Sequence, residues 1–186
     1  MYEKLKHYIF YFCTFSFIGW IWEVIVNIVT MNRLYNPGTL MGPWLPIYGW
    51  VMVFVVLLSK KVKKKWQLFI VSFILCGIIE YCTSCYLEYF YNTSWWNYDK
   101  YLLNINGRTC VEVLTVFATL CVLGVSFAVP LLDKIYNSFN KYTISTVLAI
   151  VMIMYSLDFI YSSVNPNKGR LIFFEDKIYN NANYNK

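Results

Sequence analysis

Five acidic side chains lie inside segments that are otherwise apolar enough to cross a membrane. They are Glu23, Glu80, Glu88, Glu112 and Asp158. An ionised carboxylate in hydrocarbon is costly unless it has a partner, water or a proton. Ionisable residues inside membrane segments therefore mark a candidate functional site by default.

Helical spacing places several of these acids on polar faces. In "EYCTSCYLEYF" (residues 80–90), Glu80, Ser84 and Glu88 recur every four residues and share one side of a helix. A second stripe of small and polar residues runs along the first apolar segment: Ser16, Gly19, Glu23 and Asn27. Such helices show lipid an apolar side and keep a polar side for their neighbours.

Basic partners for the acids are few. Arg108 precedes the fourth apolar segment, so it can pair with Glu112 one turn further on or with Glu88 across the hairpin. Its planar guanidinium suits a carboxylate partner. One arginine cannot neutralise five acids, so we expect the other carboxyl groups to be protonated, hydrated or bound to a cation.

Composition and hydropathy predict a membrane protein of many spans. Of the 186 residues, 59% are hydrophobic and 14% are charged, whereas soluble domains carry about 25% charged residues. Five apolar segments are candidates to cross a hydrocarbon core of about 30 Å. They lie near residues 8–30, 45–59, 66–92, 109–132 and 142–163. We predict an all-α bundle of about five transmembrane helices over residues 1–163, followed by a polar, partly disordered tail over 164–186.

The second of these segments is short and follows an irregular stretch. That stretch, "NPGTLMGPWLP", contains Pro and Gly residues that break helices. We expect a re-entrant or partly unwound approach to the second helix. Non-helical backbone of this kind is tolerated at membrane depth only where protein or water covers it.

Lysines predict the orientation of the chain. The run "KKVKKK" at residues 60–65 holds five lysines in one short loop, and such loops face the cytoplasm. The N-terminus is then cytoplasmic and the C-terminus external. With this orientation none of the five acids lies in the cytoplasmic third of the membrane.

A shared depth suggests a shared site. Hydrogen bonding between helices explains any single acid, but it gives no reason for all of them to lie in the outer half. We therefore predict an outward-facing polar chamber. Trp95 and Trp96 in the external loop are candidates for a lid over it, although aromatic residues at this depth also form interfacial belts.

Several other classes of function are disfavoured. No G-x-x-x-x-G-K-[ST] phosphate loop is present, so an ATPase would be a separate chain. The lone histidine, His7, lies at the opposite membrane face from the acids, which leaves no Ser-His or Cys-His pair. Cys82 and Cys85 form C-x-x-C without a second pair, so we expect no metal or cofactor. The clustered lysines read as a loop at the membrane and not as a nucleic-acid surface.

Four motifs together resemble a known family. They are "FIGWIWEV" (17–24), "GPWLPIYGW" (42–50), "EYCTSCYLEYFYNTSWWNYDKYLLNINGR" (80–108) and the following "TCVEV". They resemble the putative ABC transporter permease family (putative ABC-transporter type IV), which comprises small bacterial multi-span membrane proteins. The resemblance covers roughly residues 10–133. Where family members commonly read W-W-D-Y, this chain has Asn97, so an acid at that position is not essential here.

The resemblance implies a membrane subunit of a transporter. We predict a permease-like protein that spans the lipid bilayer of the bacterial plasma membrane. Its predicted partners are a separate ATPase subunit and a second copy of the same chain, with which it forms a homodimer. Its expected substrate-binding residues are Glu23, Glu80, Ser84, Glu88, Trp95, Trp96, Arg108 and Glu112. Two alternatives stay open: a scaffold for membrane assembly, and an enzyme that uses two carboxylates for acid–base chemistry on a lipid or cell-wall intermediate.

Overall fold

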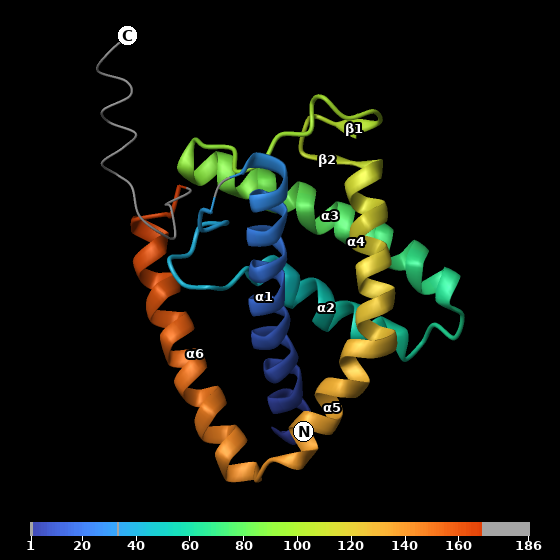
Figure 1. The fold of residues 1–186 in the computed structure, drawn as a ribbon, viewed down its shortest axis with the longest axis vertical. Coiled ribbons are helices and arrows are strands. Elements are labelled where there is room, and N and C mark those ends of the chain that lie inside the picture. Colours follow the sequence, from blue (N-terminus) through green and yellow to red (C-terminus); the bar gives the residue numbers. More distant parts are fainter. Residues whose placement is uncertain (1, 33, 169–186) are drawn as a thin grey trace.

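The computed structural model describes residues 2–32 and 34–168, which form a bundle of helices (Figure 1). The elements are α1 (Tyr2–Met31), α2 (Pro46–Ser59), α3 (Lys65–Tyr91), β1 (Asn104–Ile105), β2 (Thr109–Cys110), α4 (Val111–Leu123), the π-helical turn η1 (Gly124–Ala128), α5 (Val129–Ser138) and α6 (Lys141–Val164). Because α4, η1 and α5 run on without a break, the described chain contains five helices in all. The predicted all-α fold is confirmed. Residues 169–186, and with them most of the predicted tail, lie outside the described part of the chain.

Four of these helices have the length and apolar composition needed to cross a membrane. They are α1, α3, the continuous helix from Val111 to Ser138, and α6. Helix α2 has 14 residues, which at 1.5 Å per residue gives about 21 Å. This length is too short for a hydrocarbon core of about 30 Å.

An irregular segment, residues 34–45, precedes α2. The backbone N–H of Leu45 donates to the carbonyl oxygen of Ser16 at 2.9 Å, and Ser16 lies midway along α1. At the far end of α2, the Lys60 ammonium donates to the Tyr8 hydroxyl at 2.6 Å. The chain therefore returns as irregular backbone to the middle of α1, where α2 begins and crosses obliquely behind that helix toward the α2–α3 loop (Figure 1).

Helices α1 and α2 approach closely because two glycines face the contact. A Cβ atom at Gly49 would lie 2.6 Å from the backbone carbonyl oxygen of Phe12, and one at Gly19 would lie 2.5 Å from the Cβ of Tyr48. Small residues of this kind let helix backbones come together inside membranes. The contact also fixes where Tyr48 lies, directly against Gly19 of α1.

A kink in the long helix from Val111 to Ser138 is explained by Pro130. Proline lacks a backbone N–H and its ring clashes with the preceding turn of an α-helix. The π-helical turn η1 comes just before Pro130, which lies in the first turn of α5, and π turns accommodate interruptions of this sort. The helix therefore passes through the proline and ends at Ser138, beyond the predicted end at residue 132.

The close α1–α2 contact predicts that Gly49→Ala destabilises the protein by about 1–3 kcal/mol, the usual cost of overpacking. The backbone of Phe12 cannot move aside without shifting α1. Thermal unfolding of the purified protein in detergent would measure the change.

Gly77→Ala is the matched control for that substitution. Its Cβ would lie 3.2 Å from a methyl carbon of Leu114, and a side chain can shift by a few tenths of an ångström. An equal loss of stability in both variants would contradict this account of the helix contact.

Candidate functional site

A cavity of about 1140 Å³ lies among α1, α2, α3, the α4–η1 helix, the irregular segment 34–45 and the loop that follows α3. Four of the predicted binding residues line it: Glu23, Glu80, Trp95 and Trp96. The other four, Ser84, Glu88, Arg108 and Glu112, are absent from its lining. The structure therefore divides the predicted site into a cavity, a cluster of Arg108, Glu88 and Ser84, and Glu112, which lies apart from both.

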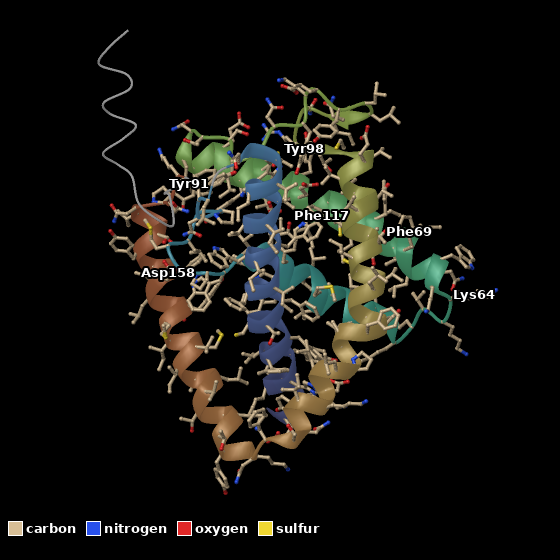
Figure 2. All side chains as sticks on the ribbon, viewed as in Figure 1. Lys64, Phe69, Tyr91, Tyr98, Phe117 and Asp158 are labelled. Atoms are coloured by element: carbon tan, nitrogen blue, oxygen red, sulfur yellow. The ribbon has the colours of Figure 1, made fainter. Side chains whose placement is uncertain are left out.

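Glu80 lies at the polar end of the cavity and is only 4% exposed. One carboxylate oxygen accepts from the Tyr98 hydroxyl at 3.0 Å, and the other accepts from Thr109 Oγ1 at 2.7 Å. Both donors come from the loop after α3, and Figure 2 shows Tyr98 at that end of the bundle. Glu80 is thus a buried acceptor that fastens the chain between α3 and α4 to α3.

The β1–β2 hairpin positions the donors of Glu80. Asn106 and Gly107 form its turn with positive φ values of 53° and 65°, and Asn-Gly is the pair that favours such tight hairpin turns. The strands pair Ile105 with Thr109, and the N–H of Tyr98 donates to the Gly107 carbonyl at 2.7 Å. This local geometry brings Tyr98 and Thr109 to the same carboxylate.

Glu23 is the second carboxylate at the cavity. Its Oε1 accepts a hydrogen bond from the hydroxyl of Tyr48 on α2. Burial raises the pKa of Tyr98, and the negative charges of Glu80 and Glu23 raise it further. Each carboxylate therefore has its own tyrosine donor, Tyr48 for Glu23 and Tyr98 for Glu80.

The Arg108 cluster lies further along α3, toward its C-terminal end. Arg108 forms an ion pair with Glu88 and donates to Ser84 Oγ at 3.1 Å. Its guanidinium also lies 5.9 Å from the centre of the Tyr81 ring. The bond to Glu88 raises the pKa of Arg108, while the Glu88 side chain is 50% exposed. Of the two pairings that the sequence allowed, the structure shows the one with Glu88.

Glu112 is an exposed residue in the first turn of α4. An acidic side chain at this position interacts favourably with the positive end of the helix dipole. This interaction gives Glu112 a local role that needs no contact with the cavity.

Asp158 is held by the irregular segment 34–45. Its Oδ1 accepts from the N–H of Met41 at 3.0 Å, and its Oδ2 accepts from the N–H of Gly42 at 2.8 Å. The indole N–H of Trp44 also donates to Oδ2 at 2.8 Å, and the hydroxyl of Ser162 donates to Oδ1 at 2.9 Å. Figure 2 shows Asp158 on α6 facing this segment. Asp158 therefore joins α6 to the irregular backbone and does not line the cavity.

Two further side chains bind the same segment. Asn167 is fully buried, and its amide donates to the carbonyl oxygens of Asn36 (2.8 Å) and Gly38 (3.1 Å). The indole of Trp95 donates to the carbonyls of Gly38 and Asn167, each at 3.2 Å. Trp95 thus links the cavity lining to the irregular segment.

Sequence reasoning missed several residues of this site. Tyr48 and Tyr98 occur within the family motifs, but nothing in the sequence pairs them with Glu23 and Glu80. The Asn-Gly turn was a usable signal for the hairpin and hence for Thr109. No sequence pattern indicated the role of Asn167, because its hydrogen-bond partners lie about 130 residues away in the chain and belong to irregular backbone.

Comparisons with known proteins give one match. The family model described as putative ABC-transporter type IV matches residues 10–163. Among curated proteins and among solved structures, nothing matches the chain.

The environment of Glu80 predicts that Glu80→Leu loosens the β1–β2 loop. The hydroxyls of Tyr98 and Thr109 would lose their shared acceptor, at about 1–3 kcal/mol for each unsatisfied group. Limited proteolysis should then cut faster between residues 97 and 106, and thermal stability should fall. Glu112→Leu is the control, because the exposed Glu112 binds neither hydroxyl. Equal cleavage of the two variants would rule out the proposed fastening.

The environment of Asp158 predicts that Asp158→Asn releases the irregular segment from α6. The amide replaces one acceptor by an NH₂ donor, so at least one of the facing N–H groups is left unpaired, at about 1–3 kcal/mol. Disulfide trapping between cysteines placed in the segment and in α6 would report the separation. Ser162→Ala should change little, since Asp158 Oδ1 still accepts from Met41. If disulfide trapping is as efficient in Asp158→Asn as in the wild type, the hydrogen bonds to Asp158 do not hold α6 against the irregular segment.

Proposed function

Because the chain belongs to the putative ABC-transporter type IV family and has four helices able to span a membrane, we propose that it is the permease-like membrane subunit of a transporter. The observation that carries this proposal is the cavity, which places two carboxylates within the membrane-spanning bundle. A structural bundle has no need for a space of this size, whereas ligand sites commonly occupy about 300–1,000 Å³.

In this proposal the cavity is the outward-facing substrate site. Glu23 and Glu80 form its polar end, and Trp95 and Trp96 cover that end from the external loop. The indole N–H of Trp96 donates to the Arg108 carbonyl at 2.8 Å. Arg108 therefore acts as a positioning residue that holds the covering loop on α3.

The energy source is a separate ATP-hydrolysing chain. The lysines of the α2–α3 loop are exposed and lie at the membrane face that we predict to be cytoplasmic. They offer a docking surface for that subunit. Five helices are few for a complete path, so the proposed assembly contains two copies of this chain in the plasma membrane of a bacterium.

Purification of the tagged full-length chain from its native membrane tests the proposal. We expect a bound ATPase whose ATP hydrolysis persists after reconstitution into nanodiscs. Lys63→Glu with Lys64→Glu should release it, because these exposed lysines lie on the proposed docking loop.

Lys100→Glu is the control, since Lys100 lies in the loop between α3 and β1 at the other end of α3. A chain that purifies without any ATP-hydrolysing partner contradicts the transporter assignment. Recovery of a partner without ATPase activity instead supports the scaffold.

A further inference from the structure

The cavity opens sideways into the membrane. Its walls include Ile18 on α1 and, on the facing helix, Leu123 and Phe127. These three side chains are also 43%, 46% and 67% exposed. Side chains that both line a cavity and reach the outer surface mark its opening. One opening therefore lies between α1 and the α4–η1 helix, where lipid chains surround the bundle. Asn32, Ser94 and Lys168 also line the cavity and are exposed, so they mark a second opening at its loop end.

The cavity is apolar at one end and polar at the other. Phe15, Met52 and Ala128 line the part near the middle of the bundle, whereas Glu23 and Asn27 lie on the outer half of α1. This division matches a molecule with a hydrocarbon chain and a polar headgroup. It also matches the orientation of a lipid in the outer leaflet, whose chains point toward the membrane centre.

Charge at the polar end selects the headgroup. Both oxygens of Glu80 already accept hydrogen bonds. Glu23 Oε1 accepts from Tyr48, and no described residue donates to Glu23 Oε2. Among the described lining residues, two carboxylates face a single basic side chain, Lys168. A headgroup that donates hydrogen bonds and carries positive charge fits this environment, because an unpaired carboxylate at membrane depth is costly.

We propose that the cavity binds a membrane lipid with an amine headgroup, which enters between α1 and the α4–η1 helix and places its ammonium group against Glu23. The inference rests on the proposed function and names the substrate class of that site. The hydrocarbon chain lies along the wall formed by Ile18, Leu123 and Phe127. A volume of about 1140 Å³ exceeds that of most drug-sized sites and leaves room for such a chain.

Photocrosslinking in nanodiscs tests this inference on the full-length chain. The bilayer is phosphatidylglycerol, and the probe is phosphatidylethanolamine with a diazirine in the middle of one acyl chain. We expect label on α1 and on the α4–η1 helix at residues that line the cavity. Glu23→Gln should lower that labelling about tenfold, which corresponds to about 1.4 kcal/mol of binding free energy.

Two controls separate the headgroup from the hydrocarbon chain. The same diazirine on phosphatidylglycerol should label the cavity only weakly, and Glu112→Gln should leave the labelling unchanged. Ala128→Trp should block the chain, because Ala128 lines the cavity, whereas Leu131→Trp on the exposed face of α5 should not. Equal labelling by both lipids, or no effect of Glu23→Gln, overturns the amine assignment.

Failure of this inference can be told apart from failure of the proposed function. If ATP hydrolysis copurifies with the chain but the cavity takes no lipid label, the transporter assignment stands and the lipid substrate is wrong. If a helix of a partner or of a second copy occupies the opening, crosslinks join two polypeptides instead of lipid and protein. That result also contradicts the inference.

Discussion

The structure depends on one constraint: irregular backbone that enters a membrane must find hydrogen-bond partners within the protein. Residues 34–45 descend to the middle of α1 before α2 begins. Their N–H and carbonyl groups are bound by Asp158 of α6, by Asn167 beyond it and by Trp95 of the α3–β1 loop. Three parts of the chain that are distant in sequence are therefore held together by a single segment. The position of α6 follows from these polar bonds more than from apolar burial, because most of its surface is exposed.

The acids of the bundle are divided between structural roles and the cavity. Asp158 binds the irregular segment, Glu80 fastens the chain between α3 and α4, and Glu88 pairs with Arg108. Glu23 is the one that lines the cavity with an oxygen to which no described residue donates. The glycine contact between α1 and α2 places Tyr48 beside Glu23, and the π turn before Pro130 shapes the facing wall. Packing of the helices and chemistry of the site thus depend on the same residues.

Prediction from sequence was strongest for the helices and weakest for the contacts between them. The apolar segments near 8–30, 45–59, 66–92 and 142–163 lie close to α1, α2, α3 and α6, because hydrophobic runs of this length are local signals. Pro130 predicted an early end to the fourth helix, yet a π turn carries the helix through it. For the site, sequence placed the acids in the outer half and predicted one chamber. The structure puts Glu23 and Glu80 at the cavity and leaves Glu88, Arg108 and Glu112 outside its lining.

The sequence by itself determined the membrane class, the helices, the family and the break at "NPGTLMGPWLP", since each depends on residues close together in the chain. Only the tertiary structure decided which donor each acid receives. Hydrogen bonds reach about 3 Å and depend on direction, so the rotation of each helix and the course of each loop choose the partners. In every case the donor comes from another element than the acid. Glu23 accepts from Tyr48, and Glu80 accepts from Tyr98 and Thr109. Asp158 accepts from the backbone of Met41 and Gly42. Spacing along one helix could place a carboxylate on a face, but it could not show what that face would meet.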